Sequence, residues 1–332
     1  MAQNPNKKST KNKATSASSS TRAPQNANAR NRRRAAEEQA EREQAAVIAK
    51  ERKQQTIIGI IVVAVVVVLV AIAGFSVWRA NRPVSEATVQ QSYDAAQAVK
   101  TKPSGANSRG GFLISKRGLD KKIAKAPTVE IYMDFLCPGC GSLNRTLDPT
   151  LTAMEQAGQI NIEIYPSAFL DSLTTDQYST RTASQVAYIA QNDPDHVIAF
   201  IANLFAEDFQ PSESDYKAVS DATLQQLAVK SGVPSDVAKK STDGTYKSWI
   251  TKISAYTPLR KELWNISGSR KGQMTTPTVR INENYWDLVS IGSANSDLVS
   301  DFLKAVGLPE SEIGTSGKLP SIGGTGKPIA IS

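Results

Sequence analysis

The sequence has few side chains that bind metals or transfer protons near neutral pH: its 332 residues include two cysteines and one histidine. A structural zinc site takes about four cysteine or histidine ligands, so the chain lacks a set for one. His196 follows an Asp-Pro-Asp run, where we expect a solvated residue in the first turn of a helix. Two Gly-Lys pairs near the C-terminus lack the Ser or Thr and the upstream glycine of a phosphate-binding loop. The sequence therefore indicates no metal and no cofactor.

Residues 1–56 lack aromatic side chains and have almost no large aliphatic ones. They contain 13 Lys and Arg against 5 Glu, so the formal charge of +8 belongs to this segment. Such a segment cannot bury enough apolar surface to offset the entropy of ordering, and we predict a disordered, basic, cytoplasmic tail. Next to a membrane its charge favours anionic headgroups, and we expect no nucleic-acid partner.

The chain has one long hydrophobic run, residues 57–78, which contains 22 residues and no charge. At about 1.5 Å per residue, a helix of this length crosses the hydrocarbon core of a bilayer. The basic excess upstream predicts a cytoplasmic N-terminus and export of residues 79–332. We therefore predict a single-pass protein of the cell membrane with an uncleaved signal-anchor. The alternative is a cleaved signal peptide, because residues 71–73, Ala-Ile-Ala, resemble a cleavage site.

Both cysteines lie in the exported part, as Cys137-Pro138-Gly139-Cys140 between a predicted strand and a predicted helix. Two intervening residues at a helix start bring the sulfur atoms within bonding distance, so the pair can cycle between dithiol and disulfide. In an exported chain, two cysteines normally pair. The alternatives are a structural disulfide and two unrelated buried cysteines, but a disulfide closing so short a loop removes little unfolded-state entropy. The pattern favours redox chemistry.

The rest of the exported part predicts an α/β domain. A stalk is expected over residues 79–110, a domain over 111–307 and a flexible C-terminal tail over 308–332. The helix after Cys137 carries an apolar stripe and ends at Gly158. Strands are predicted over residues 112–114, 128–135, 160–165, 278–281 and 285–289, a helical insertion over about 170–268, and a last helix from residue 295 or 296 to Gly307.

The residues Asp134-Phe135-Leu136-Cys137-Pro138-Gly139-Cys140 and Thr276-Pro277-Thr278 resemble the DsbA-like family, in particular its membrane-anchored actinobacterial forms. The resemblance covers about residues 111–307. It implies a thioredoxin fold with an inserted helical domain and a redox-active disulfide between Cys137 and Cys140. In such proteins the residue matching Cys137 is the nucleophile and that matching Cys140 is the resolving thiol. Thr276-Pro277 would then form a cis-proline loop beside the disulfide, where the backbone pairs with an extended substrate.

Two positions depart from the family pattern. Members often carry a buried acid six residues before the first cysteine, which shuttles the proton of the second thiol, but Ile131 stands there. Glu130 and Asp134 flank it, and either is an alternative for the missing acid, but we interpret each as an exposed strand-end carboxylate or a cap. Gly139 stands where strongly oxidising members have histidine. Without that positive charge we expect a less acidic Cys137 and a milder oxidant.

The function predicted from these residues is disulfide donation to exported proteins by an extracytoplasmic thiol-disulfide oxidoreductase. A Cys137 thiolate at a helix N-terminus is a good leaving group, which is what an oxidant needs. Its partners would be unfolded exported proteins with cysteine pairs, the membrane, and a quinone-linked re-oxidant similar to DsbB or to vitamin K epoxide reductase. The alternatives are a reductase or isomerase, and a non-catalytic anchored binding module.

Overall fold

The structure is a computed structural model, and it describes residues 85–293 and 297–330. The disordered tail predicted over residues 1–56 and the membrane helix predicted over residues 57–78 lie outside these residues. Among the helices that are described, none is long and apolar enough to cross a membrane.

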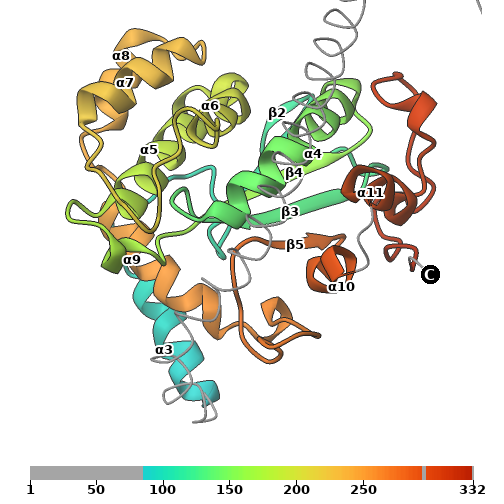
Figure 1. The fold of residues 1–332 in the computed structure, drawn as a ribbon, viewed down its shortest axis with the longest axis horizontal. Helices are drawn as coiled ribbons and strands as arrows, with labels where there is room; N and C mark the ends of the chain where they lie inside the picture. Colours follow the sequence, from blue (N-terminus) through green and yellow to red (C-terminus); the bar gives the residue numbers. More distant parts are fainter. Residues whose placement is uncertain (1–84, 294–296, 331–332) are drawn as a thin grey trace, which may run out of the picture. The chain divides into compact units, whose positions relative to one another are not determined.

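A six-stranded mixed sheet lies at the centre of the described residues, in the order β2-β1-β4-β3-β5-β6 (Figure 1). Strands β3 and β4 are parallel, and the other neighbouring pairs are antiparallel. Because parallel neighbours need a crossover, the chain passes from β3 to β4 through helix α4. This βαβ unit confirms the predicted α/β class. The strands are β1 (Phe112–Ser115), β2 (Gly118–Leu119), β3 (Thr128–Met133), β4 (Asn161–Pro166), β5 (Thr278–Ile281) and β6 (Asn284–Trp286).

Strand β3 is buried at every position because both faces of the sheet are covered. Side chains alternate along a strand, so Ile131 lies on one face and Tyr132 on the other. Ile131 lines a small cavity together with residues of α4, which therefore covers the apolar face. On the other face, Tyr132 stacks on Tyr165 with 4.1 Å between ring centroids, and Leu263 packs against the pair.

Helix α4 (Pro138–Ala157) begins directly after the first cysteine. Its buried stripe of Leu143, Leu147, Leu151 and Met154 is the one predicted from the sequence. The helix continues through Pro149 and ends at Gly158, whose φ of 77° is a left-handed conformation that favours glycine.

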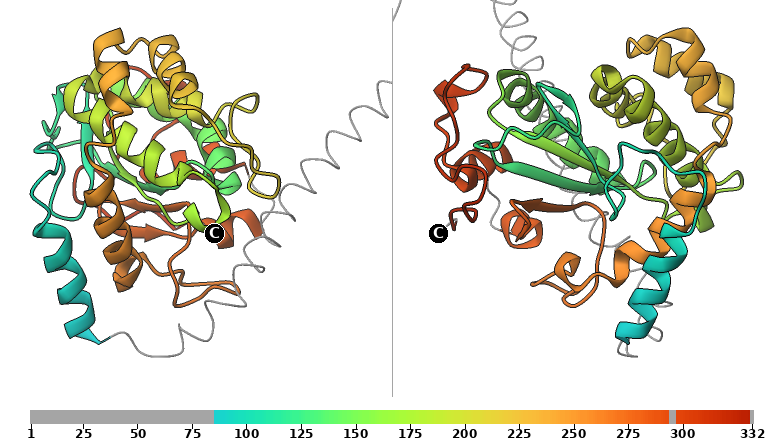
Figure 2. Two further views of the ribbon diagram at one scale, coloured as in Figure 1. Left: turned by 90° about the vertical axis from the view of Figure 1, so that its left-hand side faces the viewer. Right: turned by 180° about the vertical axis from the view of Figure 1, so that it is seen from behind.

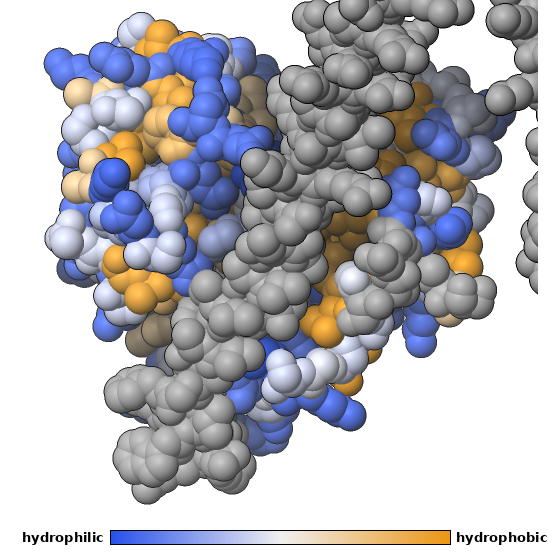
Figure 3. All heavy atoms as spheres, in the orientation of Figure 1, coloured by the Kyte–Doolittle hydropathy of each residue, from blue (hydrophilic) through white to orange (hydrophobic). Residues whose placement is uncertain are grey.

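The chain between β4 and β5 is helical, as predicted, and forms the insertion (Figure 1). Its α-helices are α5 (Tyr178–Asn192), α6 (Val197–Leu204), α7 (Asp221–Lys230), α8 (Ser235–Ser241) and α9 (Lys247–Tyr256). Short 3-10 turns lie at Asp171–Leu173, Pro194–His196, Thr257–Leu259 and Lys261–Leu263. On the face drawn in Figure 3, hydrophilic side chains cover much of the insertion, with small apolar patches between them.

Part of the predicted stalk packs against the domain. Helix α3 (Glu86–Gln97), capped by Ser85, lies along α9 (Figure 2). Ala96 is fully buried, and the rings of Tyr93 and Tyr256 meet edge to face at 5.3 Å. The stalk prediction is therefore wrong for these residues, because an apolar face of α3 is covered by the insertion.

The predicted β-hairpin is shorter than expected on its second strand. β6 ends at Trp286, and residues predicted as strand up to position 289 begin helix α10 (Leu288–Ser293). The last helix, α11 (Leu298–Val306), starts after Asp297, whose carboxylate accepts hydrogen bonds from the Val299 and Ser300 amides. It ends at Gly307 as predicted.

The C-terminal segment, residues 308–330, docks on the domain, so the prediction of a flexible tail is wrong for it. The buried Gln159 side chain donates to the carbonyls of Glu312 and Lys318, each at 2.8 Å, and accepts from the Gly314 amide. The Ile329 amide donates to the Ala305 carbonyl at 2.8 Å. The side-chain amide of Gln159 thus takes the place of water as the hydrogen-bond partner of three backbone groups in this segment. The segment also contains the 3-10 turn Glu310–Glu312.

Candidate active site

The two cysteines lie at the junction between β3 and α4. Residues 134–136 lead from the strand to Cys137, whose amide donates to the Asp134 carbonyl at 3.0 Å. Cys137 is the N-terminal cap residue of α4, and Cys140 lies in the first turn. Both thiols are free, with 7% of Cys137 and 2% of Cys140 exposed. The structure thus represents the dithiol form of the predicted pair, with Pro138 and Gly139 half-buried between the cysteines.

The two thiols have opposite pKa shifts. A hydrogen bond from the Cys140 side chain lowers the pKa of Cys137 against the effect of burial, and the Cys140 amide and the Thr276 side chain act in the same direction. Burial raises the pKa of Cys140, and its interaction with Cys137 raises it further. Cys137 at the helix N-terminus is therefore the residue that becomes a thiolate, while Cys140 keeps its proton.

The predicted cis-proline loop lies beside the cysteines. The Thr276-Pro277 peptide bond is cis, as expected from the sequence. The Cys137 thiol donates to the Thr276 carbonyl at 3.4 Å, and Pro277 lines a small cavity together with Cys140. The structure thus brings together all the predicted site residues, although about 140 positions separate the two motifs.

Asp134 is completely buried, so its interpretation as an exposed strand-end carboxylate is wrong. The carboxylate accepts hydrogen bonds from the amides of Leu136, Phe169 and Leu170 at 3.0, 2.7 and 3.0 Å. It also accepts one from the Ser179 hydroxyl at 2.7 Å. Burial raises its pKa to about 6 even though the hydrogen bonds lower it. Asp134 thus holds the loop before the cysteines against the segment after β4 and against α5.

Glu130 is also buried rather than exposed, with 3% of its surface accessible. It lies on the sheet face opposite α4 and pairs with Arg280 of β5 at 2.8 Å. The same oxygen accepts from the Tyr132 hydroxyl at 3.1 Å. Since side chains alternate along β3, Glu130 points away from the cysteines and has a structural role.

Gln210, which follows α6, contacts the active-site turn and was not found from the sequence. Its side-chain amide donates to the Cys137 carbonyl at 2.9 Å and to the Phe135 carbonyl at 3.4 Å. Its Oε1 accepts from Arg145 of α4 at 3.2 Å, and a Cβ at Gly141 would clash with this oxygen. The insertion thus holds the first turn of α4. No motif marks Gln210, because a contact across 73 residues leaves no local pattern.

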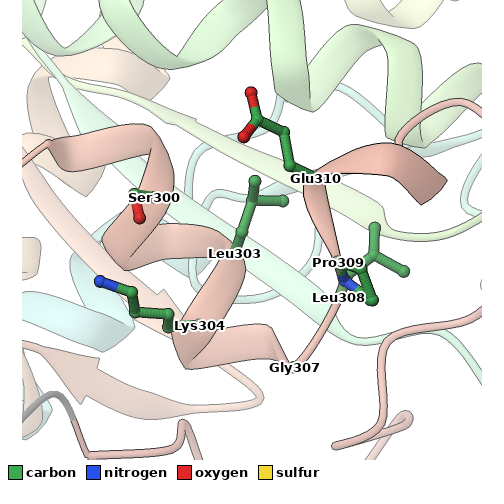
Figure 4. A pocket seen from close by; sticks show the side chains of 7 residues that line it. All are labelled: Ser300, Leu303, Lys304, Gly307, Leu308, Pro309 and Glu310. Carbon is green, nitrogen blue, oxygen red and sulfur yellow. The ribbon is translucent and has the colours of Figure 1, made fainter.

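The described residues form two hollows, of which one is lined by an active-site cysteine and the other is not. A depression of about 420 Å³, lined by α11 and the turn after it, contains neither cysteine (Figure 4). Its lining residues are Ser300, Leu303, Lys304, Gly307, Leu308, Pro309 and Glu310. The second, a cavity of about 20 Å³, is lined by Cys140 and Pro277 and by residues of β3, α4 and the end of α6. Only the second belongs to the candidate active site.

His196 has the environment expected from the sequence. Its side chain is 41% exposed and its Nδ1 lies 2.9 Å from a carboxylate oxygen of Asp193. Among the residues that the structure describes, no group of His, Cys, Asp and Glu could hold a metal ion.

A family model described as thioredoxin matches residues 123–294, more than half of the chain. Among curated proteins, the serine/threonine-protein kinase PknE of Mycobacterium tuberculosis is 33% identical over 103 residues. These residues are 30% of this chain and 18% of the kinase, so the chain spans less than a fifth of that relative.

Solved structures that resemble the chain include reduced DsbA from Mycobacterium tuberculosis, with 24% identity and a TM-score of 0.46 over 58% of this chain and 93% of DsbA. MdbA, a thiol-disulfide oxidoreductase from Corynebacterium diphtheriae, has 22% identity and a TM-score of 0.44 over 57% of this chain and 91% of MdbA.

Proposed function

The chain belongs to the thioredoxin family, and we propose that it is a DsbA-like thiol-disulfide oxidoreductase that acts through Cys137 and Cys140. The observation that carries the proposal is the asymmetry of the two thiols: the pKa of Cys137 is lowered and that of Cys140 is raised. A structural disulfide needs no such difference. A thiolate beside a protonated, buried second thiol is what disulfide exchange through a mixed disulfide requires.

The proposed direction is oxidation of substrate proteins. A substrate thiolate attacks Cys137 Sγ, the bond between Cys137 and Cys140 breaks, and Cys140 leaves with the electron pair and gains a proton. A second substrate thiolate then attacks the substrate sulfur of the mixed disulfide, and Cys137 leaves as a thiolate. The two electrons that the substrate thiols lose when they form their disulfide now reside on the cysteine pair. Stabilisation of the Cys137 thiolate makes it a better leaving group and favours the reduced protein, which supports this direction.

The proposed substrates are unfolded exported proteins with cysteine pairs, and a quinone-linked membrane protein would re-oxidise the cysteine pair. The proposal includes a membrane anchor at residues 57–78 with the catalytic domain outside the cytoplasm, on the evidence of the uncharged run and the basic residues before it. A reductase would use the same two cysteines with electrons flowing in the opposite sense, and an isomerase would use them without net electron transfer.

A trapping experiment tests the proposal. In cells expressing a Cys140→Ala variant, mixed disulfides between Cys137 and exported proteins should accumulate, because the resolving thiol is absent. Non-reducing electrophoresis and mass spectrometry would detect them, with Cys137→Ala as the matched control. Adducts on Cys137→Ala instead would reverse the roles of the two cysteines. Absence of adducts, together with no selectively reactive thiol in alkylation at neutral pH, would favour the anchored binding module.

A further inference from the structure

A side chain from the insertion binds the backbone of the proposed nucleophile. The Cys137 carbonyl accepts a hydrogen bond from the Gly141 amide at 3.2 Å and a shorter one, at 2.9 Å, from the side-chain amide of Gln210. The same nitrogen of Gln210 donates to the Phe135 carbonyl at 3.4 Å. A carbonyl oxygen has two lone pairs, so the Cys137 carbonyl can accept both bonds at once. Gln210 is half-buried and contacts Cys137 across 73 residues of sequence.

Arg145 determines which way the Gln210 amide points. Its Nη1 donates to Gln210 Oε1 at 3.2 Å and to the Phe205 carbonyl at 2.6 Å. Because an arginine only donates and a backbone carbonyl only accepts, one orientation of the amide satisfies both neighbours. The oxygen then faces Arg145 and the nitrogen faces the Cys137 carbonyl. Since hydrogen bonds in a chain polarise one another, the charge of Arg145 makes Gln210 a stronger donor.

Gly141 leaves the space that this contact needs. It is buried and follows Cys140 in α4, where its φ lies outside the left-handed region, so the backbone does not require a glycine. A glycine inside a helix is less stable than an alanine, and its presence calls for another reason. A Cβ at this position would clash with Gln210 Oε1 and lie 2.8 Å from Arg145 Nη1. Room for the Gln210 amide is that reason.

The thiolate of Cys137 forms next to groups that oppose it. A hydrogen bond from Cys140 lowers the pKa of Cys137, whereas burial and the charge of Asp134 raise it. Gly139 adds no positive charge. A thiolate is also repelled by the carbonyl oxygen of its own residue, which carries partial negative charge. A donor bound to that oxygen weakens the repulsion, and Gln210 supplies such a donor.

We propose that Gln210, oriented by Arg145, is a positioning residue for Cys137, which binds the carbonyl of the nucleophile and favours its thiolate form. The inference rests on the proposed function and deepens it. When a substrate thiolate displaces Cys137 from a mixed disulfide, negative charge develops on the Cys137 sulfur, and the donor on the carbonyl of the same residue stabilises it. The insertion therefore acts on the reaction although Gln210 touches no reacting atom.

A titration of the Cys137 thiolate tests the proposal. Gln210→Met keeps the length of the side chain and removes the donor. An ordinary hydrogen bond corresponds to a factor of about 2–10 in an equilibrium constant. The reduced full chain is kept in detergent, and the ultraviolet absorbance of the thiolate is followed against pH. At a given pH, the ratio of thiolate to thiol should be about 2- to 10-fold lower in the variant.

Equilibration with glutathione measures the same effect on the redox reaction. The disulfide between Cys137 and Cys140 takes up two electrons and becomes one thiolate and one thiol, while two glutathione molecules form a disulfide and one proton is released. At a pH where both proteins hold the thiolate, the ratio of reduced to oxidised protein should fall in Gln210→Met by the same factor. The reason is that the donor stabilises the charged, reduced form more than the uncharged disulfide.

Gly141→Ala tests the same contact from the other side. Alanine is a better helix former than glycine, and the displaced atom lies at the end of a flexible side chain, so this variant should fold. Its Cβ should push the Gln210 amide away from Cys137. The ratio of thiolate to thiol should therefore fall as it does in Gln210→Met, although the two substitutions have nothing else in common.

Two matched controls make the same changes away from the cysteines. Gln225→Met removes a half-buried amide of the insertion that donates to the Thr242 hydroxyl at 2.6 Å. Gly292→Ala adds a Cβ in helix α10, where it would meet nothing within 4 Å. Both should leave the titration of Cys137 and the glutathione equilibrium unchanged.

The outcomes separate the inference from the proposed function. A lower melting temperature of Gln210→Met with the wild-type ratio of thiolate to thiol would show a purely structural role and overturn the inference. An equal shift in Gln225→Met would also overturn it, because the effect would then not depend on contact with Cys137. If the wild type itself forms no disulfide between Cys137 and Cys140 with oxidised glutathione, the proposed function fails before any variant is compared.

Discussion

The buried carboxyl of Asp134 should make the free energy of unfolding depend on pH. The carboxyl is completely buried, and burial raises its pKa from 3.8 to about 6. The folded chain therefore holds this proton at pH values where the unfolded chain has lost it. A shift of about 2 units corresponds to about 3 kcal/mol, present below pH 3.8 and lost as the pH rises through about 6.

Asp134→Asn removes the titration and keeps the size of the side chain. The amide nitrogen would face at least one of the donors that now meet a carboxylate oxygen, so the variant should be about 1–3 kcal/mol less stable than the wild type at pH 4. Because the wild type alone loses stability from this group as the pH rises, its advantage should shrink by about 2 kcal/mol between pH 4 and pH 7.

Urea unfolding of the reduced protein at several pH values, followed by tryptophan fluorescence, measures this difference. Asp148 and Glu163, whose pKa values burial raises to about 6 and about 7, are present in both proteins, so their contribution to the pH dependence cancels. Parallel stability curves for wild type and variant would refute the reasoning. They would mean that the four hydrogen bonds keep Asp134 ionised throughout this range.

Two further predictions concern the oxidant strength and the C-terminal segment. Gly139→His should lower the pKa of Cys137 and raise the reduction potential by roughly 30 mV for each pKa unit, because an imidazolium at the helix start stabilises the thiolate and not the disulfide. Equilibration with glutathione and ultraviolet thiolate absorbance measure both quantities, and a lower pKa with an unchanged potential would contradict the electrostatic account. Gln159→Ala should release residues 312–318 and speed tryptic cleavage at Lys318 while leaving Cys137 alkylation unchanged, since three hydrogen bonds to that segment are lost. Cleavage at the wild-type rate would show that other contacts hold the segment.

The sequence by itself determined the features that depend on local patterns. The strand before Cys137, the apolar stripe of α4 and the ends of helices at Gly158 and Gly307 follow from side-chain periodicity and from the backbone preferences of single residues. The position of Cys137 at a helix N-terminus is also local, because Pro138 is favoured in the first turn. Cys137 could therefore be predicted as the nucleophile before the fold was known.

Only the tertiary structure decided which charges are buried and what they contact. Glu130 lies within β3 and Asp134 directly follows it. The two look alike in sequence, yet Asp134 holds the active-site loop and Glu130 pairs with Arg280 on the far face of the sheet. Phe205 and Pro277, which are distant in sequence, line the small cavity beside Cys140. Burial and partners arise from segments far apart in the chain, and the pKa of a carboxyl follows from these rather than from its neighbours in sequence.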